Sequence, residues 1–218
     1  MSESNARLIA LYQKQAKAYD QSGIHGLEPW RKEAVKQLHL KSGNLVVDLG
    51  CGTGLNFPWL QEAVGPQGRI IGVDLTDAML EQARRRVAGA GWKNVELVQA
   101  DAASYEFPAQ VDGILSTFAL TFIPQVKLVI QNGCRALAPG ARWVVLDMAW
   151  PRAWPLWFHH VLLFFRLSSY GITGEVVRRR PWQTVWSTMQ QSLGEVERQS
   201  FWMGFFYLAW GKQLEPPA

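Results

Sequence analysis

The sequence predicts an α/β fold built on a mostly parallel sheet with helices on both faces. Between residues 44 and 150, short apolar runs of strand length alternate with longer segments of helical periodicity. The first run, at residues 45–47, leads into closely spaced glycines, and open parallel sheets bind ligands beyond such strand ends. Because parallel strands need crossover connections, helices are expected to cover both faces of the sheet.

The expected elements follow in order, with no repeat or low-complexity linker. Before the sheet we expect two helices, an amphipathic one over residues 5–19 and one over residues 29–38 that starts at a proline. The strands are expected at residues 45–47, 69–73, 95–98, 111–115 and 143–146, and the helices between them at residues 56–64, 76–87 and 125–137. After Trp150 the alternation stops, and we expect helix over 155–167 and parts of 176–191, then two antiparallel strands at 195–199 and 201–210.

A length of 218 residues fits one domain. Its expected parts are N-terminal covering helices (1–42), a ligand-binding core (43–150), an apolar and basic helical insertion (151–194) and the final strands (195–218). Composition is 48% hydrophobic, which is enough for a substantial core. The net charge of +4 points to anionic partners only where basic residues cluster.

The two cysteines are far apart, and no metal-ligand constellation is present, so neither a disulfide framework nor a zinc site is expected. The polar N-terminus does not resemble a signal peptide, which predicts a cytoplasmic protein. The most apolar run, residues 153–165, is 13 residues long and falls short of the ~20 that span a bilayer.

The glycine loop is the most informative segment. Gly50, Gly52 and Gly54 permit unusual backbone angles and close approach of a ligand. The dinucleotide fingerprint G-x-G-x-x-G fails, because Leu55 or Phe57 stands at its last position, and no P-loop lysine follows.

Three aspartates accompany this loop. Asp48 suits a ligand with an ammonium group better than a diphosphate. Asp74 ends the second strand, where a carboxylate can accept hydrogen bonds from both hydroxyls of a ribose, and Asp101 follows the third strand, where it can accept an adenine amino group.

At this point the sequence resembles class I S-adenosylmethionine-dependent methyltransferases. The segments 47–54, 72–74, 99–102 and 137–140 look like the motifs of this family, and together they cover roughly residues 43–147. The resemblance implies a Rossmann-like, seven-stranded sheet with an antiparallel last strand. S-adenosylmethionine would be the cofactor and S-adenosylhomocysteine the product. It also implies the cofactor-binding residues Tyr19, Asp48, Gly50, Cys51, Gly52, Asn56, Asp74, Leu75, Met79, Asp101, Ala102, Ser116 and Thr117.

Two branches of the family compete for the acceptor. The N-terminal residues Tyr12, Ala16, Tyr19 and Asp20 look like the covering helix of the ubiquinone/menaquinone-type branch. Segments 54–58, 180–182 and 204–211 look closer to bacterial phospholipid and betaine-lipid N-methyltransferases. The leading hypothesis is therefore methylation of a phospholipid amine of the phosphatidylethanolamine type. The alternatives are C- or O-methylation of a quinone-like or other hydrophobic molecule, and a non-catalytic cofactor- or membrane-binding protein.

Each residue expected to act on the acceptor also has a purely structural alternative. Tyr12 and Tyr19 are expected to orient an amine and stabilise the methylated cation, or else to pack the helix. His159 is a candidate general base, with His160 beside it, or a core residue. Arg178, Arg179 and Arg180 are expected to hold a lipid phosphate, or else to form a solvated patch, and Tyr207 is expected to contact the acceptor.

Partners beyond the acceptor follow from composition. The basic N-terminal helix and residues 154–165 resemble interfacial segments, which predicts peripheral contact with an anionic membrane at the inner face of the cell membrane. The alternative is that residues 154–165 form a lid over the acceptor. Nucleic acid and metal are not expected as partners.

Overall fold

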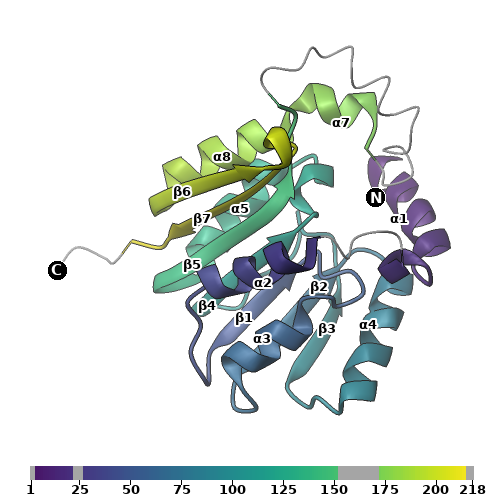
Figure 1. Ribbon diagram of the computed structural model, residues 1–218, viewed down its shortest axis with the longest axis vertical. Coiled ribbons are helices and arrows are strands. Elements are labelled where there is room, and N and C mark those ends of the chain that lie inside the picture. Colours follow the sequence, from purple (N-terminus) through teal and green to yellow (C-terminus); the bar gives the residue numbers. More distant parts are fainter. Residues whose placement is uncertain (1–2, 22–26, 152–171, 215–218) are drawn as a thin grey trace.

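The computed structural model describes residues 3–21, 27–151 and 172–214. Seven strands form one sheet in the order β3-β2-β1-β4-β5-β7-β6, in which β7 alone runs antiparallel to the other six strands (Figure 1). The strands are β1 (Leu45–Leu49), β2 (Arg69–Asp74), β3 (Val95–Gln99), β4 (Val111–Thr117), β5 (Leu137–Met148), β6 (Gly194–Phe201) and β7 (Phe206–Lys212). The predicted fold class, with its antiparallel last strand, is confirmed.

Helices cover both faces of the sheet because alternate residues of each strand point to opposite sides. One face packs against α2 (Glu28–Gln37), α3 (Phe57–Val64) and α4 (Asp77–Ala90). The other packs against α5 (Val126–Ala136), α8 (Pro181–Ser192) and the short helix η3 (Leu120–Phe122). Within β4, for example, Ile114 faces the second group and Leu115 the first, and both are fully buried.

The N-terminal helix α1 (Glu3–Gln15) lies at the side of the molecule next to α4 (Figure 1). The prediction of one helix over residues 5–19 is wrong at its end, because α1 stops at Gln15 and a separate short helix, η1 (Tyr19–Gln21), follows. Between them the chain turns and buries Ala16, which brings the Tyr12 and Tyr19 rings to a centroid distance of 6.0 Å.

The helix predicted in part over residues 176–191 is two helices, α7 (Gly174–Arg179) and α8. Arg180 separates them in the left-handed conformation, with φ 50°. The break occurs here because Pro181 disfavours the helical conformation of the residue before it. The predicted helix over 155–167 lies outside the described residues, and the four-part division of the chain stays a prediction.

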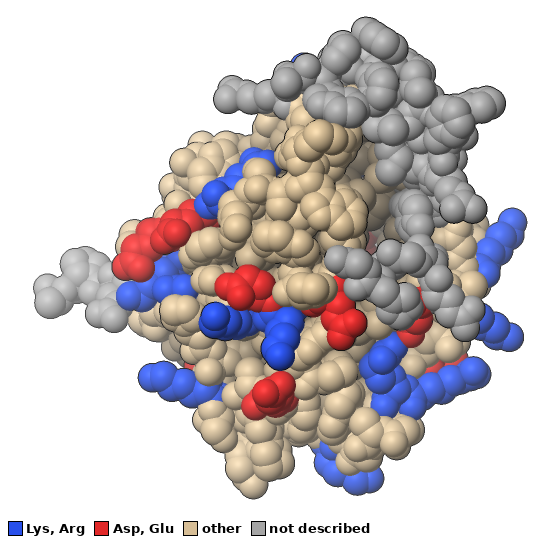
Figure 2. Space-filling view, in the orientation of Figure 1, with Lys and Arg blue, Asp and Glu red and all other residues tan. Residues whose placement is uncertain are grey.

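Basic and acidic side chains are interspersed on the face that Figure 2 shows. Exposed ion pairs occur among the described residues, such as Arg84 with Asp77 on α4. Exposed pairs of this kind contribute little to stability, because water screens them. On this face the net positive charge is spread out and does not form one basic patch.

Candidate active site

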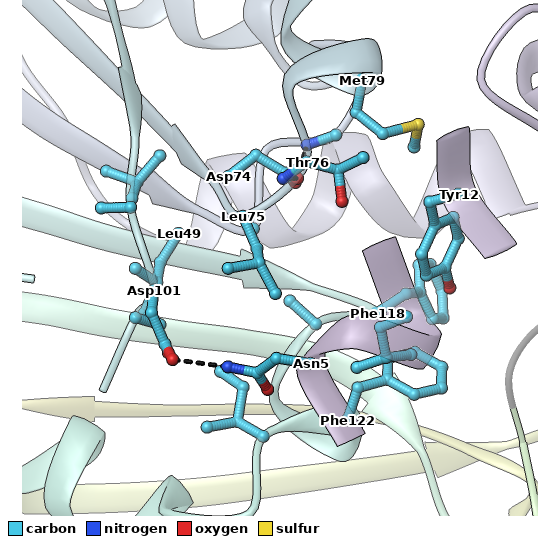
Figure 3. A pocket seen from close by; sticks show the side chains of 18 of the residues that line it. Asn5, Tyr12, Leu49, Asp74, Leu75, Thr76, Met79, Asp101, Phe118 and Phe122 are labelled. Atoms are coloured by element: carbon cyan, nitrogen blue, oxygen red, sulfur yellow. Dashed lines mark hydrogen bonds between the residues drawn. The ribbon is translucent and has the colours of Figure 1, made fainter. Parts of the chain in front are cut away.

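A pocket of about 120 Å³ opens where β1, β2, β3 and β4 end (Figure 3). The loops after these strands form its floor, and α1 closes it from the side. Its described lining comprises Asn5, Leu8, Tyr12, Tyr19, Leu49, Gly50, Gly52, Val73, Asp74, Leu75, Thr76, Met79, Ala100, Asp101, Ala102, Thr117, Phe118, Ala119, Phe122, Ile123 and Pro124. This position at the carboxyl ends of parallel strands is the one that the sequence predicts.

The glycine loop is held against β2 by its own backbone. The amides of Gly50 and Cys51 both donate to the Val73 carbonyl, at 2.7 and 2.9 Å. Gly50 has a φ of +75°, and a Cβ at this position would lie 2.2 Å from the Cβ of Ala119. Only glycine therefore fits between the loop and the segment after β4.

Asp74 connects the loop to the start of α4. Its Oδ2 accepts from the Gly52 amide at 2.9 Å, and its Oδ1 accepts from the Thr76 amide at 2.8 Å. Burial raises the pKa of Asp74, and these backbone donors act in the opposite direction. Thr76 is the N-cap residue that precedes α4, but its side chain makes no capping hydrogen bond, and the Asp74 carboxylate accepts from its amide instead.

Asp101, in the turn after β3, is a second carboxylate of the pocket, and α1 reaches it directly. Asp101 Oδ1 accepts from the Ala103 amide at 2.9 Å within its own turn. Its Oδ2 accepts from the side-chain amide of Asn5 at 2.6 Å, the contact drawn in Figure 3. Asn5 is 8% exposed, so the first turn of α1 packs into the pocket.

Beneath the loop, Asp48 is fully buried. Both of its oxygens accept from Asn56 Nδ2, at 3.1 and 3.0 Å. Burial raises the pKa of Asp48 to about 7, although the Asn56 hydrogen bond and the nearby Arg31 charge lower it in part. Asn56 also donates to Thr117 Oγ1, so the network ends at a residue of the pocket wall.

The side of the pocket opposite Asp74 is aromatic. The Tyr12 ring lies edge-on to Tyr19 and to Phe122, with centroids 6.0 and 6.3 Å away, and Phe118 lies on the same side (Figure 3). Burial, then Tyr19, Asp74 and Asp147, raise the pKa of Tyr12, so its hydroxyl stays protonated at neutral pH. Among the described lining residues there is no lysine, arginine or histidine.

Ten of the predicted site residues line this pocket. They are Tyr12, Tyr19, Gly50, Gly52, Asp74, Leu75, Met79, Asp101, Ala102 and Thr117. Four others lie just behind the lining: Asp48 and Asn56 in the buried network, Cys51 buried in the loop, and Ser116, which accepts a long 3.4 Å hydrogen bond from Trp143 Nε1. Their roles in cofactor binding stay predictions.

The residues predicted to contact the acceptor are not brought together with this pocket. Arg178 and Arg179 lie on α7 and Arg180 follows it, and none of the three is among the described lining. Tyr207 is fully buried in β7, and the Arg198 guanidinium lies 4.2 Å from its ring centroid. Arg198 lines a separate cavity of about 770 Å³ with Trp150, Trp182 and Trp186. His159 lies outside the described residues.

Several lining residues were missed from the sequence. Asn5 and Leu8 come from α1, and Phe118, Phe122 and Ile123 come from the segment after β4. The helical spacing of Leu8 and Tyr12 was a usable signal. The segment after β4 carries no motif, and only its position after a central strand could have pointed to it.

The lining of the pocket is complementary to a nucleoside-type ligand that carries positive charge. Two carboxylates, Asp74 and Asp101, and the glycine loop line the pocket, and the described lining offers no cation for a diphosphate. No group of three metal-ligating side chains occurs in the described part of the chain. In the same part, no helix is both long and apolar enough to cross a membrane.

Comparisons with known proteins point to one protein family. Residues 46–140 match the family model described as a methyltransferase domain. The demethylmenaquinone methyltransferase of Shouchella clausii is 32% identical over 158 residues, which is 72% of this chain and 66% of that protein. The demethylmenaquinone methyltransferase of Symbiobacterium thermophilum is 35% identical over 57% of this chain and 50% of that protein. The one of Listeria welshimeri is 29% identical over 76% of this chain and 75% of that protein. The chain thus spans between half and three quarters of these relatives.

Solved structures agree on the fold. A methyltransferase from Aquifex aeolicus superposes with a TM-score of 0.69 at 21% identity, over 93% of this chain and 98% of that one. The geranyl diphosphate C-methyltransferase of Streptomyces coelicolor superposes with a TM-score of 0.66 at 14% identity, over 93% of this chain and 82% of that one.

The named relatives support the quinone side of the resemblance and not the phospholipid side. The chain belongs to the class I S-adenosylmethionine-dependent methyltransferases, an enzyme family, and S-adenosylmethionine is its cofactor.

Proposed function

We propose that the protein methylates a ring carbon of a hydrophobic quinol, an acceptor of the demethylmenaquinone type. The observation that carries the proposal is the aromatic side of the pocket, formed by Tyr12, Phe118 and Phe122 without a described cationic side chain. Such a wall suits a flat uncharged ring and offers nothing to a headgroup phosphate. The names of the relatives point to the same class of acceptor.

The cofactor is assigned to the opposite side of the pocket. Asp74 would accept hydrogen bonds from the ribose hydroxyls, and Asp101 would accept one from the adenine amino group, with Leu75 and Met79 against the adenine ring. The glycine loop would lie along the methionine part. Bound here, S-adenosylmethionine supplies an electrophilic methyl group on a sulfonium.

Methylation of a quinol carbon releases one proton overall, so a proton acceptor is required. Tyr12 does not supply it, because its raised pKa keeps the hydroxyl protonated. We assign Tyr12 a positioning role, in which its hydroxyl hydrogen-bonds the acceptor and its ring packs against it. Positioning alone can contribute as much as ~7–11 kcal/mol to such transfers. His159 and His160 stay candidates for the base.

Methylation of a phospholipid amine, which the sequence favoured, receives no support from the relatives. It requires a phosphate-binding group near the transferred methyl, and Arg178, Arg179 and Arg180 are not among the described residues of the pocket. The corresponding predictions of membrane contact and of an inner-face location therefore lack their main support.

The acceptor assignment is tested by a labelled-methyl assay. The purified full chain is incubated with methyl-labelled S-adenosylmethionine and, in separate arms, a reduced demethylated naphthoquinone or phosphatidylethanolamine vesicles. We expect label in the quinol, with a product heavier by one methylene group in mass spectrometry. The oxidised quinone is the matched control and should accept no label, because its ring carbon is not nucleophilic. Label in the lipid alone would overturn the proposal.

Asn5 is expected to compete with the cofactor for Asp101. Its side-chain amide already occupies Oδ2, the atom assigned to the adenine amino group. Replacing Asn5 by alanine should therefore tighten S-adenosylhomocysteine binding by about 3- to 10-fold, the worth of roughly one hydrogen bond. Calorimetric titration measures this effect. Gln13→Ala, on the exposed face of the same helix, is the control and should leave affinity unchanged. Weaker binding of Asn5→Ala would show that Asn5 holds the cofactor and does not compete with it.

A further inference from the structure

Arg31, on α2, is a buried cation outside the region that matches the family model. It is 5% exposed, and no other lysine or arginine of the described residues is buried. Its Nε is buried without a hydrogen-bond partner. Burying a charge costs several kcal/mol, and exchanging a buried ion pair for apolar groups is often neutral or stabilising. Stability alone therefore does not account for an arginine here.

The contacts of Arg31 converge on the pocket. Its Nη1 donates to Asn56 Oδ1 at 2.9 Å and to Thr117 Oγ1 at 2.7 Å. Asn56 in turn donates to both oxygens of Asp48. One guanidinium thus joins α2 to the start of α3 and to the ends of β1 and β4, which are the strand ends that build the cofactor site.

Arg31 also supports the aromatic wall. Its guanidinium carbon lies 5.1 Å from the ring centroid of Phe118, a cation–π arrangement. Phe118 has a φ of +56°, which is strained for a residue with a side chain and needs support from its surroundings. Thr117 and Phe118 both line the pocket, so the position of this wall depends on Arg31.

We propose that Arg31 is a positioning residue for the cofactor, which holds the Thr117–Phe118 wall in place and compensates the Asp48 charge beneath the glycine loop. The inference rests on the cofactor placement in the proposed function but not on the acceptor. Without the guanidinium, Asp48 would bind a proton more readily and could no longer accept from Asn56 with both oxygens. The loop and the wall would then lose their common anchor.

The polar and charged groups that act on Arg31 and Asp48 lie on neighbouring parts of the site. Tyr19, Asp20 and Asp48 act on Arg31, and burial lowers its pKa. Arg31, Asn56 and Asp74 act on Asp48. Because burial raises the pKa of Asp48 to about 7, affinity for S-adenosylhomocysteine, which carries an ammonium group, should rise with pH through neutrality. Removing the Arg31 cation moves this rise to higher pH.

The test compares Arg31→Met and Arg31→Lys with the wild type by calorimetric titration with S-adenosylhomocysteine between pH 5.5 and 8.5. We expect Arg31→Met to bind S-adenosylhomocysteine at least ~10-fold more weakly at pH 7. The rise of its affinity with pH should occur at a higher pH than in the wild type. Arg31→Lys should recover most of the affinity and the wild-type pH profile, because lysine keeps the positive charge and both hydrogen bonds of Arg31 come from a single nitrogen, which one ammonium can replace. Arg85→Met is the matched control, since Arg85 is 63% exposed on α4, and it should change neither quantity.

A folded Arg31→Met protein with wild-type affinity and an unchanged pH profile would overturn the proposal. If Arg31→Met does not fold, the double variant Arg31→Met/Asp48→Asn removes both buried charges and leaves none uncompensated. The proposal then requires that the double variant bind S-adenosylhomocysteine more weakly than the wild type, with an affinity that does not rise through neutral pH. Wild-type affinity in the double variant would overturn the proposal. If the wild type itself binds no S-adenosylhomocysteine, the cofactor placement fails, whereas failure of the quinol assay leaves the role of Arg31 intact.

Discussion

Replacing Gly50 by alanine is expected to abolish measurable cofactor binding and to destabilise the protein by about 2–4 kcal/mol. The new Cβ would lie 2.2 Å from the Cβ of Ala119, and φ at this position is +75°. Relief requires the loop to move away from β2, which breaks the hydrogen bonds from Gly50 and Cys51 to Val73. Urea unfolding and S-adenosylhomocysteine titration measure the two effects.

Gly89→Ala provides the matched control for this substitution. Gly89 lies within α4, and nothing comes within 4 Å of a Cβ built on it. Alanine is the better helix former, so this variant should be more stable by up to about 1 kcal/mol and should bind the cofactor normally. If Gly50→Ala also bound normally, the close contact with Ala119 would not constrain the loop.

Replacing Asp74 by alanine is expected to weaken S-adenosylhomocysteine binding by about 1–3 kcal/mol, or roughly 5- to 150-fold. The change removes the acceptor of the Gly52 and Thr76 amides as well as the group assigned to the ribose. The glycine loop and the start of α4 would then lose their shared anchor. Calorimetric titration at pH 7.5 measures the change.

Asp74→Asn separates the two contributions, because it keeps one acceptor oxygen and loses the charge. We expect its affinity to fall between those of the wild type and Asp74→Ala. Asp77→Ala is the control, since Asp77 is an exposed carboxylate in the first turn of the same helix. Unchanged affinity in Asp74→Ala would remove Asp74 from the cofactor site.

Most of the fold could be predicted from local pattern. The five core strands and the helices between them follow from periodicity, since a strand buried on both faces, such as β1, contains a short apolar run, here residues 45–47. Helix ends depend on more than periodicity. The end of α1 at Gln15 depends on how Ala16 packs, and the break at Arg180 depends on Pro181, a local signal that the sequence contains.

The acceptor could not be predicted in the same way. Short segments near the C-terminus favoured a lipid amine, whereas the relatives and the aromatic wall of Phe118 and Phe122 favour a quinol. Neither phenylalanine belongs to a motif. A side chain that recognises an apolar ring differs from an ordinary core residue only in where it points, and sequence spacing in an irregular segment does not contain that information.

The glycine spacing and the aspartates at successive strand ends determined the cofactor class from the sequence alone, because the backbone geometry of a strand-to-helix loop is set locally. Tertiary structure decided which residues share the pocket. It placed Asn5 on Asp101 and Arg31 under Thr117, contacts between residues 96 and 86 positions apart. Contacts at that separation depend on how the whole chain packs, so the Asp48 loop that identified the cofactor proved to be anchored by an arginine that its own motif does not include.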